Sequence, residues 1–338
     1  MFEAGKLKIF VDIQDNRNLG DDLLFLANIK NLIKINWNGH KVQYLVKSYR
    51  LRALALEFIE FNKILGVNID VGVLGNCDVY IHSGGTLFTN RYSFRTRLAF
   101  ALRKALPSSA FQKTGADFNA FMSLGIDDKV VLKQKVSQKL SEADFVWCRD
   151  VFSCGNYHLM VGDLGSLYYA SDAVYSLKEF LDILGSDVCK TNNVGIISRG
   201  ITCFNPRSVT TLDTSVSIGF NGEGGTDLSY DGSFESLKET IRKIIACKLI
   251  YTERFHGAIL SDLFCIPQIV NGFDQKLRVF CNNRDSIPLG SDLYLISEPL
   301  CGRTLKHISD NHHKIYRLIG KKISEKLGLR GKNEESIN

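Results

Sequence analysis

Short apolar runs of strand length alternate with longer amphipathic stretches along most of the 338 residues, and this alternation limits the folds available to the chain. In the N-terminal half the predicted strands are Lys8–Ile13, Val42–Val46, Asp78–His82, Phe118–Leu124 and Phe145–Cys148. The predicted helices between them are Asp21–Ile33, Leu51–Phe61 and about Asp127–Leu140. Strands separated by helices favour a parallel sheet wrapped by helices, with ligand loops at the carboxyl ends of the strands.

The alternation restarts in the C-terminal half, after a mixed region at Asp163–Asn192. Strands are predicted at Asn193–Ser198, Lys248–Thr252 and Gln268–Val270, and helices at Ser233–Ala246, capped by Ser233, and Ala258–Phe264. We therefore expect two doubly wound α/β domains, at residues 1–170 and 190–303. The C-terminal segment at 304–338, a basic helix and tail, is expected to cross back from the second domain to the first.

Composition narrows the class of protein. Apolar residues make up 45% and charged residues 23%, as in ordinary globular proteins. The net charge of +6, from 42 basic and 36 acidic residues, favours anionic ligands but is too small to indicate a nucleic-acid partner. The nine cysteines include no Cys-x-x-Cys pair, so we expect a reducing compartment without a disulfide framework or zinc site.

The sequence predicts a cytoplasmic protein that at most rests on the inner face of a membrane. Its N-terminus begins Met-Phe-Glu and lacks the apolar region of a secretory signal. No stretch approaches the ~18 to 20 apolar residues that span a bilayer. Basic residues are frequent from Lys306 to Lys332. They form either a solvated helix face or a contact with phospholipid head groups or a lipid-linked substrate.

The glycine-containing turns are candidate phosphate loops. There is no Walker sequence, and Gly222–Gly225 does not join a strand to a helix, which argues against a dinucleotide fingerprint. The turn Asn18–Asp22 does lie where a strand feeds a helix, so its backbone N–H groups, including that of Gly20, favour an anion. Asp21 is either a helix cap or a base that accepts a hydroxyl proton.

The predicted strand ending at His82 continues into Ser-Gly-Gly-Thr. Gly84 and Gly85 allow the backbone to approach a ligand closely, and Ser83 and Thr86 offer hydroxyls to phosphate or sugar oxygens. His82 either contacts the substrate or is a structural histidine.

The sequence Glu253-Arg-Phe-His-Gly257 is the most specific group of candidate catalytic residues, and it again lies at a predicted strand end. If the strand extends that far, alternation places Arg254 and His256 on one side. Arginine grips carboxylate or phosphate with a planar fork, and histidine exchanges protons near neutral pH. The alternative is a surface arginine and a core histidine. Arg199 and Lys276 follow neighbouring predicted strands. No clustered spacing indicates a metal.

Together these segments resemble the polysaccharide pyruvyl transferase family. The resemblance rests on five motifs in order over about residues 8 to 280: Asn18-Leu-Gly-Asp-Asp-Leu-Leu24, His82-Ser-Gly-Gly-Thr-Leu-Phe88, Asp144-Phe-Val-Trp-Cys-Arg-Asp150 with Ser153, Gly195-Ile-Ile-Ser-Arg199, and Arg254-Phe-His-Gly-Ala-Ile-Leu260 followed by Pro267 and Lys276. It implies two Rossmann-like domains of the glycosyltransferase-B-like class, with the N-terminal domain expected on the acceptor side and the C-terminal domain on the donor side.

The resemblance also implies a reaction: transfer of pyruvate from phosphoenolpyruvate, as co-substrate, to two hydroxyls of a sugar or lipid-linked glycan, with no other cofactor. Its Arg and His map to Arg254 and His256. We hypothesise that His256 is the general acid, Arg254 with Arg199 or Lys276 holds the donor, and Asp21 is the base. A nucleotide-sugar glycosyltransferase and a non-catalytic sugar- or phosphate-binding module remain as alternatives, since fold alone does not fix chemistry. The acceptor sugar and the oligomeric state stay open.

Overall fold

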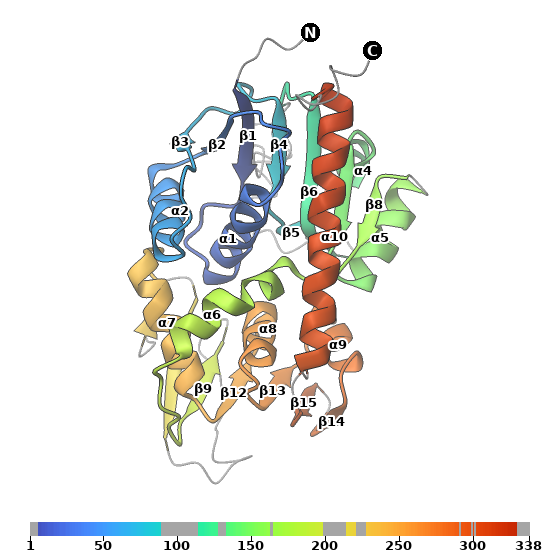
Figure 1. Cartoon of the computed structure of the whole chain (residues 1–338). Helices are drawn as coiled ribbons and strands as arrows, with labels where there is room; N and C mark the ends of the chain where they lie inside the picture. The colour runs from blue at the N-terminus through green and yellow to red at the C-terminus, as the bar shows by residue number, and fades with distance from the viewer. Residues whose placement is uncertain are drawn as a thin grey trace, which may run out of the picture. The chain divides into compact units, whose positions relative to one another are not determined.

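The computed structural model describes residues 6–88, 114–127, 133–162, 165–198, 214–220, 228–290, 292–298, 300 and 302–329. The chain divides into two compact units (Figure 1). The first unit contains Met1–Asp15, Leu24–Ala173 and Asp310–Asn338, and the second contains Asn16–Leu23 and Val174–Ser309. Both units therefore combine segments that are far apart in the sequence.

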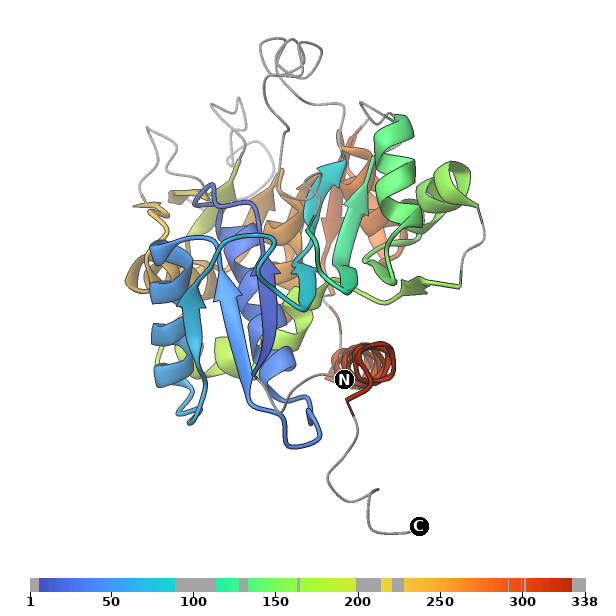
Figure 2. The same cartoon turned by 90° about the horizontal axis from the view of Figure 1, so that it is seen from above.

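A parallel sheet forms the centre of the first unit, with the strand order β3-β2-β1-β4-β6-β7-β8 and β5 paired to β6 (Figure 2). The strands are β1 (Leu7–Asp12), β2 (Val42–Val46), β3 (Ile69–Val71), β4 (Val79–His82), β5 (Gly85–Phe88), β6 (Phe118–Ile126), β7 (Phe145–Cys148) and β8 (Leu167–Tyr169). The apolar strands β4, β6 and β7 are almost entirely buried, as expected for a sheet covered on both faces.

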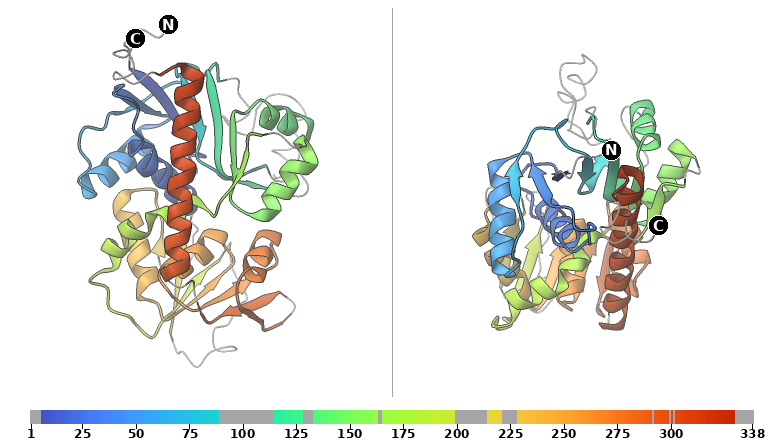
Figure 3. Two further views of the ribbon diagram at one scale, coloured as in Figure 1. Left: turned by 45° about the vertical axis from the view of Figure 1, so that its right-hand side comes forward. Right: turned by 45° about the horizontal axis from the view of Figure 1, so that its top comes forward.

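The helices of this unit are α2 (Tyr49–Phe61), α4 (Lys133–Ser141) and α5 (Val151–Val161), together with α1 (Leu19–Ile33) from Leu24 onward and α10 (Gly302–Leu327) from Asp310 onward. Ser48 and Asp150 start α2 and α5, because each side chain accepts a backbone N–H from the first turn. The C-terminal half of α10 lies along the first sheet beside α1, where the Tyr316 hydroxyl donates to Asn28 Oδ1 at 2.8 Å (Figure 3). The predicted return of the C-terminal helix to the first unit is thus present.

The second unit is built on a sheet with the order β11-β10-β9-β12-β13-β15-β14. Its strands are β9 (Val194–Ile197), β10 (Ser215–Gly219), β11 (Leu228–Ser229), β12 (Leu249–Thr252), β13 (Gln268–Asn271), β14 (Ser286–Pro288) and β15 (Leu293–Ile296). All pairs are parallel except β13 with β15 and β15 with β14. The helices are the 3₁₀ helix η2 (Ala173–Leu177), α6 (Lys178–Gly185), α7 (Phe234–Ala246), α8 (Phe255–Leu263) and α9 (Gln275–Asn282).

The predicted α/β class is confirmed: the chain has two doubly wound Rossmann-like sheets with helices between the strands. The predicted bounds of β2 and β7 match the observed ones. The strands β3, β5, β8, β10, β11, β14 and β15 were not predicted. Of these, β3, β8, β11 and β14 have only two or three residues, too few to show a period. The predicted loop at Ser83–Thr86 is also wrong in part, since Gly85 and Thr86 begin β5.

A buried ion pair anchors α8 within the second unit. Asp262 Oδ2 lies 2.9 Å from Arg284 Nη2 and accepts the Tyr175 hydroxyl, also at 2.9 Å. The other carboxylate oxygen accepts the Gln268 side chain at 3.1 Å. The Asp262 carboxylate is fully buried, so these bonds replace its lost hydration and hold α8 against η2, α9 and β13.

Helix α7 begins where the sequence predicts, because the Ser233 hydroxyl accepts the Ser236 N–H at 3.1 Å. We expect Ser233→Ala to lower the free energy of unfolding of the second unit by about 1 kcal/mol through loss of this cap. Calorimetric unfolding would measure the change, with Ser186→Ala as the control, because the Ser186 hydroxyl donates to a carbonyl at the end of α6 and caps no N-terminus. Equal stability of the Ser233 variant and the wild-type protein would contradict the assignment of this cap.

Candidate active site

The chain order reverses between β9 and β12 in the second sheet. Strands β10 and β11 lie on one side of this point, and β13 lies on the other. In doubly wound sheets, ligands bind beyond the carboxyl ends of the strands at such a reversal, because the flanking connections diverge there. Ser198 and Arg254 follow β9 and β12 at this position, and Arg254 Nε donates to the Ser198 carbonyl at 2.9 Å. This bond orients the Arg254 guanidinium.

Strand geometry does not extend to His256, which corrects the predicted alternation. Strand β12 ends at Thr252, and α8 begins at Phe255, three residues before the predicted Ala258. The Thr252 hydroxyl accepts the Arg254 N–H and donates to the Arg254 carbonyl, both at 3.0 Å, and so closes a tight turn. His256 is therefore in the first helical turn, and its position relative to Arg254 is set by this turn.

His256 packs directly on Gly20. A Cβ atom added to Gly20 would lie 2.0 Å from His256 Nδ1, well inside van der Waals contact. Both residues belong to the second unit, although they come from opposite halves of the sequence. Gly20 was predicted to bind an anion through its N–H, but that group donates to Asn18 Oδ1 at 2.9 Å. In this structure the absence of a side chain at Gly20 makes room for the imidazole.

The helix cap at this turn is Asn18, because α1 begins at Leu19 and Asn18 Oδ1 also accepts the Asp21 N–H at 3.4 Å. Asp21 is therefore the third residue of the helix rather than its N-cap. A capping interaction of its carboxylate in the first turn and the role of base both stay predictions. Asp21 is half-buried, whereas Asp22 is fully buried and accepts the Tyr230 hydroxyl at 2.6 Å.

Of the two further predicted cations, the structure describes Lys276. Lys276 lies in the first turn of α9, near the carboxyl end of β13, and is 6% exposed. Its backbone N–H donates to the cap residue Asp274 at 3.0 Å. Arg199 lies outside the described residues, as does Gly222–Gly225.

The other predicted group lies in the first unit, at the matching reversal between β1 and β4. His82 ends β4, and Ser83 donates its N–H to the Asp12 carbonyl at 2.7 Å. Both side chains are buried, and the Ser83 hydroxyl has no hydrogen-bond partner among the residues that the structure describes. Gly84 has φ +98°, and a Cβ there would lie 2.5 Å from the Met122 carbonyl, so glycine is required. Gly85 and Thr86 begin β5.

Burial lowers the pKa of His82 to about 4, because the charged imidazolium loses its hydration. His82 is accordingly neutral at physiological pH. Its Nδ1 accepts the Gly84 N–H at 3.2 Å, which leaves the ring proton on Nε2. His82 is therefore a hydrogen-bond donor and acceptor without charge.

Sequence reasoning missed the charged pair beside this group. Asp12 at the end of β1 is fully buried, lies 3.0 Å from Lys47 Nζ and accepts the Tyr80 hydroxyl at 2.8 Å. Lys47 also donates to the Ile13 carbonyl. Asp12 interrupts the apolar run Lys8–Ile13. A charged residue inside an apolar strand was the sequence signal that could have indicated this buried pair.

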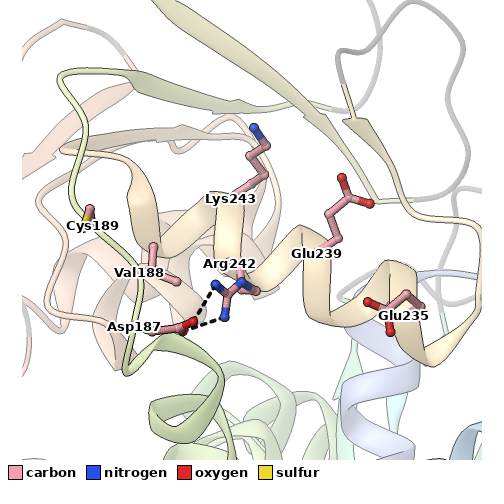
Figure 4. Close-up of a pocket in the computed structure, with 7 residues that line it drawn as sticks. All are labelled: Asp187, Val188, Cys189, Glu235, Glu239, Arg242 and Lys243. Atoms are coloured by element: carbon pink, nitrogen blue, oxygen red, sulfur yellow. Dashed lines mark hydrogen bonds and ion pairs between the residues drawn. The ribbon is translucent and has the colours of Figure 1, made fainter.

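A surface pocket of about 510 Å³ opens elsewhere in the second unit (Figure 4). It is lined by Asp187, Val188, Cys189, Glu235, Glu239, Arg242 and Lys243. Asp187–Cys189 precede β9, and Arg242 and Lys243 lie near the end of α7, so this part of the pocket is toward the amino-terminal edge of the sheet. Arg242 points to Asp187 and binds both of its carboxylate oxygens, at 2.7 and 3.0 Å. None of the predicted site residues that the structure describes lines this pocket.

Among the residues that the structure describes, no helix is long and apolar enough to cross a membrane. No group of three or more His, Cys, Asp or Glu side chains in the same ranges is arranged to hold a metal ion.

Comparison with known proteins places the chain in a family. The family model for polysaccharide pyruvyl transferases matches residues 17–270, well over half of the 338 residues. The chain belongs to the polysaccharide pyruvyl transferase family. It is accordingly a transferase of a family that acts in polysaccharide biosynthesis, and the matched segment includes Gly20, Arg254 and His256.

Other comparisons are more distant. No curated protein matches the sequence. Among solved structures, the UDP-GlcNAc 2-epimerase from Methanocaldococcus jannaschii is 10% identical with a TM-score of 0.47, covering 94% of this chain and 100% of that one. The UDP-GlcNAc 2-epimerase from Neisseria meningitidis is 9% identical with a TM-score of 0.44, covering 96% and 98%. A functionally uncharacterized protein from Klebsiella pneumoniae is 14% identical with a TM-score of 0.44, covering 78% and 82%.

Proposed function

We propose that the protein is a ketal-forming pyruvyl transferase that moves pyruvate from phosphoenolpyruvate to two hydroxyls of a surface-polysaccharide sugar or of its lipid-linked precursor. The observation that carries the proposal is the placement of Arg254 and His256 at the chain reversal of the second sheet, within a chain of this family. A guanidinium suits the two anionic groups of phosphoenolpyruvate, and an imidazole suits proton transfer.

The chemistry requires an electrophilic carbon. His256 donates a proton to C3 of phosphoenolpyruvate, which converts the methylene to a methyl group and gives C2 cationic character. A sugar hydroxyl attacks C2 and loses its proton to a base, for which Asp21 is our candidate. The C2–O bond to phosphate then breaks, and a second hydroxyl adds to C2 with loss of its proton. The products are a cyclic ketal and inorganic phosphate.

Donor binding falls to the second unit in this proposal. Arg254 is oriented by the Ser198 carbonyl, and the first turn of α8 adds the positive end of a helix dipole. Lys276, at the start of α9, supplies further positive charge, and Arg199 is retained as a second candidate. These groups also stabilise charge on the departing phosphate.

Acceptor binding is assigned to the first unit. His82, the last residue of β4, and the residues after it, Ser83, Gly84, Gly85 and Thr86, are our candidates for hydrogen bonds to sugar hydroxyls. We also propose peripheral contact with anionic lipid through α10, where Lys306, Lys314, Arg317 and Lys321 are exposed. Such a contact would bring the enzyme to a lipid-linked acceptor.

The decisive experiment incubates the protein with phosphoenolpyruvate and a library of acceptor glycans. We expect phosphate release that depends on both substrates, and a fixed mass increase on one glycan. Thermal protection by phosphoenolpyruvate, compared with UDP- and CMP-sugars, separates this function from nucleotide-sugar transfer. Protection by a nucleotide sugar alone would overturn the proposal. Binding without phosphate release on any acceptor would favour the non-catalytic module.

Arg254→Lys tests donor binding. An ammonium has neither the planar fork nor the Nε–H that Arg254 donates to Ser198. Loss of hydrogen bonds to charged groups predicts an increase of about 10- to 100-fold in KM for phosphoenolpyruvate. Steady-state kinetics would measure it, with Arg278→Lys as the control because Arg278 lies on the surface of the same unit. A wild-type KM for Arg254→Lys would show that the Arg254 guanidinium does not bind phosphoenolpyruvate.

A further inference from the structure

A segment from the beginning of the chain completes the second unit. Residues Asn16–Leu23 belong to it, although the rest of α1 belongs to the first unit. The Leu19 N–H donates to the Phe220 carbonyl at 3.0 Å. The Tyr230 hydroxyl, at the end of β11, donates to Asp22 Oδ2 at 2.6 Å across 208 residues of sequence. Two contacts therefore join the first turn of α1 to the region around β10 and β11.

The hydrogen bond between Tyr230 and Asp22 fixes the position of the Asp22 carboxylate. Both residues are 0% exposed, so water does not compete with the hydroxyl for the carboxylate. The separation of 2.6 Å is that of a hydrogen bond from a hydroxyl to a carboxylate oxygen. Asp22 also donates its N–H to the Asn18 carbonyl at 2.9 Å. Movement of Asp22 would therefore move the whole first turn.

The first turn of α1 also contains the glycine against which the His256 ring packs. Gly20 is two residues before Asp22, and the imidazole lies against its Cα with no room for even a Cβ. A shift of the turn toward the ring would produce a clash, and a shift away would leave the ring unsupported. The position of the imidazole is thus tied to the position of Asp22.

We infer that Tyr230 is a positioning residue that acts through Asp22 and Gly20 to fix the imidazole of His256. The inference rests on the proposed function, in which His256 is the general acid. Because proton transfer depends on the distance between donor and acceptor atoms, a displaced ring slows the chemical step. Phosphoenolpyruvate binding should be unaffected, since Arg254 is held by Ser198 and Thr252.

Tyr230→Phe tests the inference by removing one hydroxyl. We expect kcat for pyruvyl transfer to fall roughly 10- to 100-fold, with KM for phosphoenolpyruvate changed less than about twofold. Gly20→Ala should produce the same division between kcat and KM, because the added Cβ displaces the ring. The matched control is Tyr316→Phe, which removes another buried tyrosine hydroxyl, bonded to Asn28 in the first unit. It should leave kcat unchanged.

A double-mutant cycle distinguishes positioning from general loss of structure. If Tyr230 acts through His256, Tyr230→Phe should lower kcat by less than about twofold in a His256→Gln background. A full 10-fold decrease in that background would overturn the inference, as would wild-type kcat in the single variant.

NMR of the histidine ring supplies a measurement that does not depend on activity. The His256 signals are assigned by their loss in His256→Gln. Tyr230→Phe should shift them, whereas Tyr316→Phe should not. Unshifted His256 signals in Tyr230→Phe would overturn the inference even if the protein transfers pyruvyl groups. Shifted signals in a protein without pyruvyl transfer on any acceptor would support the coupling and overturn the proposed function.

Discussion

Replacing His256 by glutamine is expected to lower turnover by roughly 10²- to 10⁴-fold, the usual contribution of a positioned general acid. Glutamine keeps polar atoms and similar size beside Gly20, but it cannot deliver a proton to C3 of phosphoenolpyruvate. Because Arg254 and α8 remain in place, KM for phosphoenolpyruvate should stay within a few fold. The measurement is the rate of acceptor-dependent phosphate release under saturating donor.

The control for this variant is His313→Gln on the exposed face of α10. It removes a histidine from a surface position outside the proposed site and should leave turnover unchanged. If His256→Gln retained wild-type turnover, His256 would have no part in proton transfer, and another acid would have to be found. Unfolding curves of both variants should be compared, so that a lower rate is not ascribed to a smaller folded fraction.

Acidification is expected to destabilise the first unit strongly between pH 6.5 and pH 4. Burial lowers the pKa of His82 and of His312 from 6.5 to about 4. Between these values the unfolded chain binds two protons that the folded chain does not, so stability falls as the pH falls. Each histidine contributes about 3 kcal/mol that is fully present above pH 6.5 and lost by pH 4.

Tryptophan fluorescence can follow this loss, because both tryptophans, Trp37 and Trp147, belong to the first unit. Denaturant unfolding at several pH values gives the slope of stability against pH. His82→Asn can still accept the Gly84 N–H, and His312→Gln can still donate to the Ser171 carbonyl that His312 contacts at 2.9 Å. Each variant should reduce the slope by about half.

His158→Gln is the matched control, because His158 is exposed on α5 in the same unit. It should leave the slope as in the wild-type protein. The assignment would be wrong if His82→Asn and His312→Gln also kept the full slope, since the acid sensitivity would then come from carboxylates.

Local patterns were sufficient for most of the fold. The period of the apolar residues located β2, β7 and β12, and the serine before an amphipathic stretch located the start of α7. Such features depend on neighbouring residues, so they can be read from sequence. The start of α8 was misplaced because Thr252 turns the chain with a side-chain hydrogen bond that competes with strand geometry.

The sequence by itself determined the two doubly wound sheets, the family motifs and the residue types available for chemistry. Only the tertiary structure decided that residues 16–23 join the second unit, that Gly20 lies beneath His256, and that Asp22 is fixed by Tyr230. The physical reason is separation along the chain. Strand and helix periods arise from contacts within a few residues, whereas the contacts around His256 join side chains more than 200 residues apart and form only when the apolar faces pack.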